Sequence, residues 1–307
     1  LSFDGQDDYI DLGSGPSFNL EDFTLSTWFK TNWSSNQGGA WTFLMGSQDR
    51  YALLLGGIHN EGGCKLRFTI ELAPGSGVYG NIESQTDVSD GEWHHVAISR
   101  NNSTGQFKMF LDGSYVGNNE DVMTGQSESI ALSGELTIYA PFQIGAWNTS
   151  GRASFNGLID EAIIWDYELN ESQIQELLNE SVSNDENGLI AFWNFNDGNG
   201  DMLTDISGNG NNGTIYGATW SEDVYVPPVI GCMDEFAENY NSDATVNDGS
   251  CYGYPQDGNR SLSFDGENDH VNVDVNTDND FSISGWFKYQ TADNSNTIIA
   301  SSSNDFI

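Results

Sequence analysis

The sequence predicts an all-β fold with one short helix. Its composition is the first indication: 12% of the 307 residues are aromatic, and 35 are glycine. Many short strands separated by glycine-rich turns produce this combination. The second indication is alternation, because apolar side chains at every second position line one face of a strand.

Strands are predicted at residues 23–30, 92–100 and 108–116. The first has an apolar face formed by Phe23, Leu25, Thr27 and Phe29. The third reads as a hairpin that turns at Asp112 and Gly113, because an Asp-Gly pair favours a type I′ turn.

Residues 158–167 predict a long strand, with Ile159, Ile163 and Trp165 on its apolar face. The helix follows directly. Asn170 is its N-cap and Gln173 has the spacing of a capping box. The buried stripe of the helix is Ile174, Leu177 and Leu178.

The charge is strongly acidic, with 46 Asp and Glu against nine Lys and Arg, a net charge of -37. Binding to nucleic acid needs clustered basic residues, and anionic lipid headgroups repel such a surface. No apolar run approaches the length of a membrane span. We therefore expect no nucleic-acid partner and no membrane insertion. Bound divalent cations or a salty medium reconcile this charge with a folded chain.

An internal repeat sets the domain organisation. Residues 1–10 return as residues 262–271, and residues 22–30 return as residues 280–288. The two offsets are 261 and 258 residues, which predicts that these residues are a window onto a longer, repetitive protein. We expect a first domain at 1–182 and the truncated start of a second copy at 255–307.

Cys232 and Cys251 bracket a short polar segment, whereas Cys64 stands alone. We expect the pair to be bridged, so that residues 227–254 form a small clasped module, and Cys64 to be free. A bridged pair suits an oxidising, extracellular compartment.

Five segments, in order, resemble the laminin-G-like (concanavalin-A-like) jelly-roll family. They are residues 1–10, 23–30, 91–97, 109–113 and 155–161. The resemblance implies an antiparallel two-sheet sandwich.

Residues 188–220 resemble the opening segment of the same family. We therefore expect 183–226 to open the second unit, with folding back onto the first domain as the alternative. The clasped module resembles a small repeat of giant secreted proteins of marine Bacteroidota, which implies a multidomain protein exported to the cell surface.

The resemblance also implies a calcium site. An Asp on the last long strand, Asp160, is expected beside Asp4 and the carbonyl group of Gly5 on the first strand. Asp265 and Gly266 begin the same site in the second copy. Calcium takes six to eight oxygen ligands, so these residue types fit, although turn residues of an acidic protein also look like this.

The clasped module carries a second set of oxygen donors: Asp234, Asn239, Asn241, Asp243 and Asp248. They indicate either a further calcium site or a solvated acidic turn. Their spacing is not that of an EF-hand.

Catalysis is not expected. The Glu-x-Asp-x-x-Glu strand that places two carboxylates on one face in laminarinase-type enzymes of this sandwich does not occur. His94 and His95 are adjacent strand residues, so they point to opposite faces and do not share an ion.

Glycan binding is expected through Trp33, Trp41 and Trp147, which lie in loop-like contexts. Packing of these rings over the core is the alternative. The first hypothesis for function is therefore a non-catalytic, calcium-stabilised repeat of a secreted or cell-surface adhesin or filament. It binds a glycan or a surface protein, or associates with itself. The second is a carbohydrate-binding module of a secreted polysaccharide-degrading enzyme.

Overall fold

The computed structural model describes residues 1–33, 41–48, 50–57, 64–71, 79–118, 136–147, 153–179 and 182–253. The chain divides into two compact units, Leu1–Tyr254 and Pro255–Ile307. The second copy of the repeat, including Asp265 and Gly266, lies outside the described residues.

The elements of the first unit follow in chain order. They are β1 Ser2–Asp4, β2 Tyr9–Asp11, the 3-10 helix η1 Pro16–Phe18, β3 Phe23–Lys30, β4 Trp41–Ser47, β5 Tyr51–Gly57, β6 Cys64–Glu71, β7 Tyr79–Glu83, β8 Trp93–Asn101, β9 Gln106–Leu111, β10 Ser114–Asn118, β11 Phe142–Ile144, β12 Asn156–Trp165, α1 Glu171–Glu176, β13 Leu189–Trp193, β14 Met202–Leu203, β15 Gly213–Tyr216, β16 Ile230–Gly231 and β17 Val246–Asn247.

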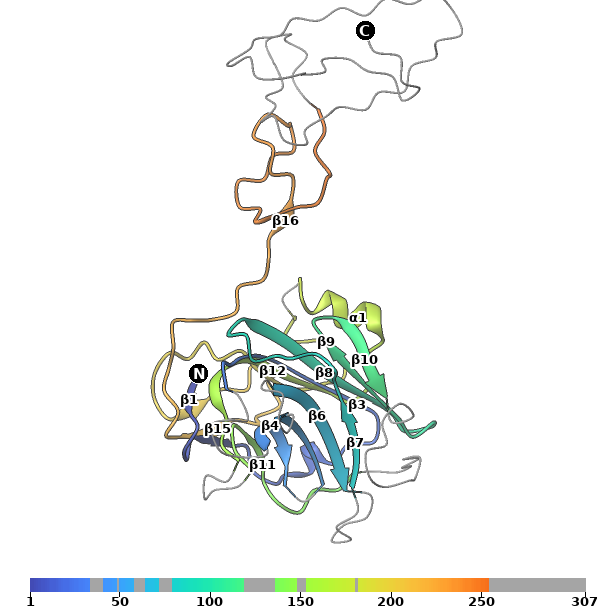
Figure 1. Cartoon of the computed structure of the whole chain (residues 1–307), viewed down its shortest axis with the longest axis vertical. Coiled ribbons are helices and arrows are strands. Elements are labelled where there is room, and N and C mark those ends of the chain that lie inside the picture. Colours follow the sequence, from blue (N-terminus) through green and yellow to red (C-terminus); the bar gives the residue numbers. More distant parts are fainter. Residues whose placement is uncertain are drawn as a thin grey trace, which may run out of the picture. The chain divides into compact units, whose positions relative to one another are not determined.

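Two antiparallel sheets lie face to face (Figure 1). Sheet A has seven strands in the order β1-β12-β3-β8-β9-β10, with β13 also paired to β12. Sheet B has eight, in the order β14-β15-β2-β11-β4-β5-β6-β7. The predicted all-β two-sheet sandwich with one short helix is confirmed. No described helix is long and apolar enough to cross a membrane.

The core lies between the sheets and takes alternate side chains from each. Phe23 of β3 and Phe68 of β6 both contact Phe107 of β9, with ring centroids 6.2 and 5.5 Å apart. All three rings are buried. Burial of large apolar side chains, at about 25 cal/mol per Å² of area removed from water, is the main force that holds the two sheets together.

Two local predictions are confirmed. The β9–β10 hairpin turns at Asp112 and Gly113, whose φ angles of 49° and 74° are those of a type I′ turn. Helix α1 has the predicted capping box, in which the side chains of Asn170 and Gln173 each accept a hydrogen bond from the other's backbone N–H.

The predicted face of β12 is wrong beyond Asp160. Ile159 is in the core between the sheets, but Ile163 and Trp165 lie on the opposite face of sheet A. Between Asp160 and Ile163, β12 advances three residues while β3 advances two, from Trp28 to Ser26. This bulge inserts one residue and therefore reverses the faces of all later side chains.

The expectation that 183–226 opens the second unit is also corrected. β13 pairs with β12, and β15 pairs with β2, so both strands complete the first sandwich. Trp193 is fully buried in its core, with its ring 6.4 Å from that of Phe18. The backbone groups of β12 beyond the end of β1 need partners, and β13 supplies them.

The clasped module is bridged as predicted, by a disulfide between Cys232 and Cys251. Strand β16, which directly precedes Cys232, forms a short parallel pair with β17, which lies between the two cysteines in sequence. Cys64 is free and buried, as expected. Burial raises the pKa of its thiol to about 12, which makes it a poor nucleophile.

Because Trp193 fills the core of the first sandwich, Trp193→Ala should lower the free energy of unfolding of the first unit by about 3–5 kcal/mol. Tyr252→Ala, at an exposed aromatic position of the clasped module, is the matched control and should change it by less than about 0.5 kcal/mol. Urea denaturation of both variants measures the difference. Equal stabilities would show that β13 does not belong to this core.

Candidate functional site

The outer face of sheet B, opposite the core, carries a cluster of aromatic side chains. Alternation along β5 places Ala52 and Leu54 on this face. With the buried ring of Phe43 they form an apolar cluster separate from the core, and Trp41 and Trp147 pack against it half-buried. We call Trp41, Phe43 and Trp147 the aromatic face.

Trp41 is held between a glycine and an arginine. A Cβ atom at Gly56 would lie 1.7 Å from the indole, so only glycine leaves room for the ring. The guanidinium carbon of Arg67 is 3.5 Å from the ring centroid, a cation–π contact. Glu83 pairs with Arg67. Burial lowers the pKa of Arg67 to about 10, so it remains charged at neutral pH.

Trp147 stands edge-on to Phe43, with ring centroids 5.6 Å apart and planes at 86°. The chain that follows Trp147 is fixed to β4 by two hydrogen bonds. The N–H of Phe43 donates to the carbonyl oxygen of Ala153 at 2.8 Å, and the hydroxyl of Thr42 donates to that of Ser154 at 2.6 Å. These bonds hold residues 153 and 154 against β4.

The same outer face continues towards β2 and β15. Tyr9 and Tyr216 stack there with centroids 4.6 Å apart, while their neighbours Ile10 and Ile215 point into the core. On β11, between β2 and β4, Gln143 is buried and its Nε2 has no hydrogen-bond partner among the described residues. An unpaired buried amide donor costs about 1–3 kcal/mol, which an oxygen of a ligand would recover.

The structure therefore brings Trp41 and Trp147 together and removes Trp33 from the predicted set. Trp33, three residues after the end of β3, is only 8% exposed and belongs to the core. Arg67, Glu83 and Gln143 were missed. The alternation of residues 64–70, with every second side chain apolar, is the signal that places Arg67 on the outer face.

The predicted calcium cage of Asp4, Gly5 and Asp160 is not assembled. In the pairing of β1 with β12, Asp4 lies opposite Asn156, four positions from Asp160. At about 3.3 Å per residue, the backbone position of Asp4 is roughly 13 Å from that of Asp160 along the strand. Asp4 instead comes together with Asp7 and Asp8, whose ligand atoms all lie within 4.8 Å of one another.

Asp160 has a different role in the structure. Its carboxylate is buried and accepts hydrogen bonds from the backbone N–H groups of Glu161 at 3.0 Å and Tyr225 at 3.1 Å. The Tyr225 ring stacks on Trp28 with centroids 3.4 Å apart. These contacts hold residues 221–226 against the outer face of sheet A, where Asp223 also pairs with Lys30 at 2.9 Å.

In the clasped module, the predicted oxygen donors close turns. Asp234, Asn241 and Asp248 accept hydrogen bonds from N–H groups two residues further on, at 2.8–3.0 Å. Asn239 accepts from the N–H of Tyr252 and donates to the carbonyl oxygen of Ser250. Asp243 is exposed. The calcium site predicted in this module stays a prediction.

The two histidines lie on opposite faces of β8, as predicted. His95 is buried and tilted against Trp28, and burial lowers its pKa to about 4, so it is neutral. His94 contacts Asp112 at 2.8 Å and Asp90 at 3.2 Å. Each has a structural partner, and neither faces the aromatic face of sheet B.

Comparison with known proteins identifies the family. Residues 4–175, more than half of the chain, match the family described as the concanavalin A-like lectin/glucanases superfamily, Laminin_G_3. The chain belongs to this family. The laminin-G-like prediction is thereby confirmed.

Curated relatives of this family member are much longer. Sushi, von Willebrand factor type A, EGF and pentraxin domain-containing protein 1 of Rattus norvegicus is 27% identical over 114 residues, which are 36% of this chain and 3% of the relative. The Mus musculus protein of the same name is 27% identical over 129 residues, 41% of this chain. The chain thus spans about 3% of the length of the curated relatives it matches.

Solved structures show the same fold. A proposed carbohydrate-binding protein from Bacteroides ovatus ATCC 8483 superposes with a TM-score of 0.53 at 18% identity, covering 70% of this chain and 57% of that chain. This likeness supports the concanavalin A-like sandwich.

The contacts of His94 predict a pH dependence of stability. Its hydrogen bond to Asp112 is the largest of the effects that raise its pKa above 6.5 in the folded chain. A raised pKa stabilises the fold below the unfolded value of about 6.5, and this contribution is lost as the pH rises through the folded pKa. Relative to His94→Gln, the wild-type free energy of unfolding should therefore fall across that range.

Urea denaturation of wild type and His94→Gln between about pH 5 and pH 9 measures this difference. Asp112→Asn removes the main partner and should flatten the wild-type profile. A difference between wild type and His94→Gln that does not change with pH would contradict the assignment.

Proposed function

We propose that this chain is a non-catalytic, glycan-binding repeat of a secreted or cell-surface adhesive protein. The observation that carries the proposal is the aromatic face of sheet B. Sugar rings present apolar C–H faces that stack on indole rings, and their hydroxyl groups need polar partners beside that platform. Trp147 offers the ring, Trp41 holds the guanidinium of Arg67 on this face, and Arg67 and Gln143 offer donors.

The charges on the same face favour binding over hydrolysis. A glycosidase needs two carboxylates on either side of the scissile bond, about 5–9.5 Å apart. Glu83 is paired with Arg67, and the carboxylate of Asp11 accepts the N–H of Gly13 at 2.8 Å. Each of these two carboxylates thus has a structural partner.

The adhesive role rests on two further observations. The unit recurs in the sequence at an offset of about 261 residues, and a polymeric stalk needs copies of one domain whereas an enzyme needs one appended module. The disulfide between Cys232 and Cys251 suits an extracellular compartment. The carbohydrate-binding module of a polysaccharide-degrading enzyme is the alternative, and self-association into a filament remains a prediction.

Glycan binding is tested on an array that holds both cell-surface glycans and plant and algal polysaccharides. Trp147→Ala removes the ring and Trp41→Ala removes the support of Arg67. Each should weaken binding at least about tenfold, which corresponds to about 1.4 kcal/mol. Tyr252→Ala in the clasped module is the control and should bind as wild type does. Far-ultraviolet circular dichroism confirms that each variant is folded.

Binding to cell-surface glycans supports the adhesive role, and binding to storage or cell-wall polysaccharides alone supports the enzyme-appended alternative. No binding by wild type, or binding that both tryptophan variants retain, contradicts the proposed site.

Calcium stabilisation is the second part of the proposal. A ligand that binds only the folded chain stabilises it by RT ln(1 + [L]/Kd), about 2.7 kcal/mol at a hundredfold excess over Kd. Calcium should therefore raise the Tm and a chelator should lower it. Asp7→Asn should reduce this shift if the ion binds near Asp4, Asp7 and Asp8, whereas a reduction by Asp243→Asn would place an ion in the clasped module. A Tm that is indifferent to chelator would make the calcium prediction wrong.

A further inference from the structure

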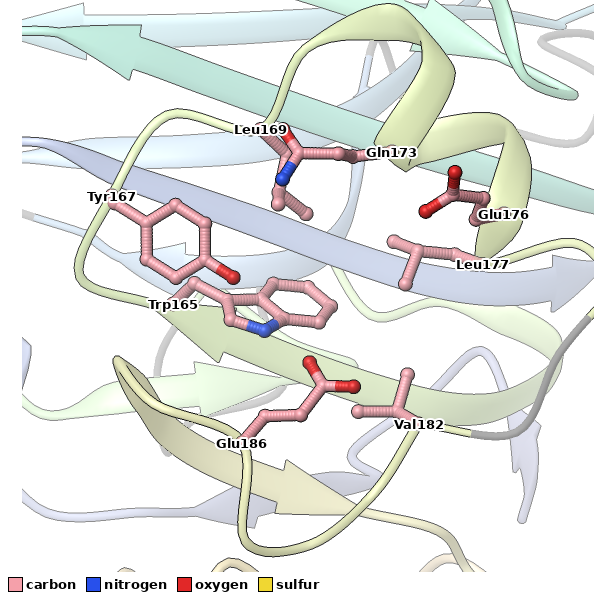
Figure 2. Close-up of a pocket in the computed structure, with 8 residues that line it drawn as sticks. All are labelled: Trp165, Tyr167, Leu169, Gln173, Glu176, Leu177, Val182 and Glu186. Atoms are coloured by element: carbon pink, nitrogen blue, oxygen red, sulfur yellow. The ribbon is translucent and has the colours of Figure 1, made fainter.

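A small pocket lies on the other side of the molecule, on the outer face of sheet A. It is formed where β12 ends, beside helix α1 and the chain that leads into β13 (Figure 2). Its lining residues are Trp165, Tyr167, Leu169, Gln173, Glu176, Leu177, Val182 and Glu186. Its volume of about 110 Å³ is enough for several water molecules or for one small polar group of a ligand.

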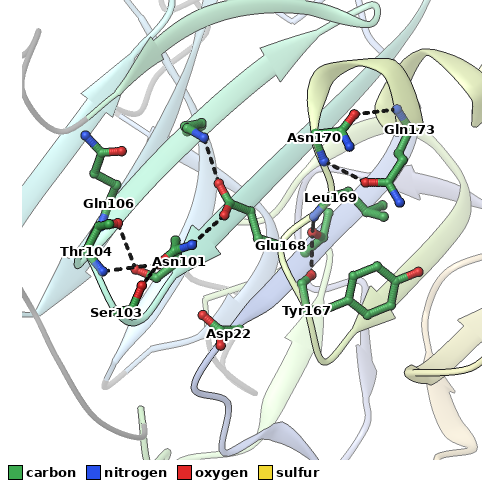
Figure 3. A network of polar contacts seen from close by, with 12 residues as sticks. Asp22, Asn101, Ser103, Thr104, Gln106, Tyr167, Glu168, Leu169, Asn170 and Gln173 are labelled. Carbon is green, nitrogen blue, oxygen red and sulfur yellow. Dashed lines mark hydrogen bonds and ion pairs between the residues drawn. The ribbon is translucent and has the colours of Figure 1, made fainter.

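The walls of this pocket are held in place by hydrogen bonds (Figure 3). The hydroxyl of Thr24 donates to the carbonyl oxygen of Tyr167 at 2.9 Å and accepts the N–H of Leu169 at 2.8 Å. Glu168 accepts from Asn101 and pairs with Lys108, both at 2.7 Å. The pocket is therefore anchored to β3, β8 and β9 rather than carried on a free loop.

The inner wall of the pocket contains an unpaired donor. Trp165 is 1% exposed, and its indole Nε1 has no hydrogen-bond partner among the described residues. Figure 2 shows this nitrogen on the side of the ring that faces Glu186. A buried N–H without an acceptor costs about 1–3 kcal/mol, so an oxygen bound in the pocket would be stabilised there.

The rim of the pocket is negatively charged and uncompensated. Glu176 and Glu186 both line it, and neither carboxylate has an ion pair or a side-chain hydrogen bond within the described part of the chain. Burial is the largest effect that raises the pKa of Tyr167, and the negative charges of Glu186 and Asp166 raise it further. The charge of Glu186 therefore reaches the Tyr167 side chain that lines the pocket.

These features select an organic cation over a metal ion. Calcium and magnesium need about six oxygen ligands, whereas five of the eight lining residues are apolar or aromatic, including Leu169, Leu177 and Val182. An ammonium group attached to carbon gains from carboxylates on one side and apolar contact on the other. The indole N–H of Trp165 can in addition donate a hydrogen bond to a neutral oxygen close to that ammonium group.

We propose that the pocket beside helix α1 binds the free amine of an amino sugar, with Glu176 and Glu186 facing the ammonium group and the indole N–H of Trp165 facing a neighbouring hydroxyl. This site lies on sheet A, so it is independent of the aromatic face of sheet B. With both sites, the chain can bind a partly deacetylated glycan at the aromatic face and at this pocket.

The test uses D-glucosamine and N-acetyl-D-glucosamine as probes, titrated into the full 307-residue chain at pH 6.5 in about 0.15 M salt, where exposed charges are screened beyond roughly 8 Å. The two sugars differ at the nitrogen, which is charged only in the first. Glucosamine should bind saturably with a Kd on the order of 1 mM, as expected for about a dozen non-hydrogen atoms. N-acetyl-D-glucosamine should bind at least about tenfold more weakly, since acetylation removes the charge.

Variants separate the pocket from general attraction to an acidic protein. Glu176→Gln and Glu186→Gln should each weaken glucosamine binding at least about fivefold, which corresponds to about 1 kcal/mol. Glu235→Gln, an exposed carboxylate of the clasped module, should leave it unchanged. All three are surface substitutions that keep the shape of the side chain. No saturable binding, equal binding of both sugars, or an equal loss in Glu235→Gln would each overturn the proposal.

Discussion

Strand β12 must satisfy its backbone hydrogen bonds along both edges, and the rest of the sandwich depends on how it does so. One edge is taken by β3 along most of its length, while β1 and β13 share the other. Because these partners come from the start of the chain and from beyond helix α1, the first domain closes only after residue 193. β15 then completes the opposite sheet by pairing with β2.

The bulge at Asp160 and Glu161 gives this strand two different faces. Glu161 takes a φ of 45°, and one extra residue turns the second half of β12 over. Ile159 therefore fills the core, while Ile163 and Trp165 support α1 and the pocket on the outside. At the bulge itself, the buried carboxylate of Asp160 accepts a hydrogen bond from the N–H of Tyr225, which holds residues 221–226 against sheet A.

Most of the described basic residues of this acidic protein form ion pairs or hydrogen bonds within the fold. Lys30, Arg67 and Lys108 each pair with a carboxylate, and the first and last of these pairs join segments far apart in the sequence. Arg50 and Arg100 are buried and donate to backbone carbonyl oxygens. The two candidate binding regions differ in charge. Arg67 and Glu83 form an ion pair beside the aromatic face, whereas Glu176 and Glu186 of the pocket beside α1 have no ion pair within the described part of the chain.

The sequence by itself determined the all-β class, the type I′ hairpin at Asp112 and Gly113, the capping box at Asn170 and the clasp between Cys232 and Cys251. Each of these depends on interactions between residues close in the chain or on a simple alternation of side chains. Only the tertiary structure decided that Trp41 and Trp147 share one face while Trp33 is buried, that Asp4 and Asp160 are apart, and that β13 completes the first domain. These outcomes depend on strand register and on one inserted residue, and a shift of a single position exchanges the inner and outer faces of a strand.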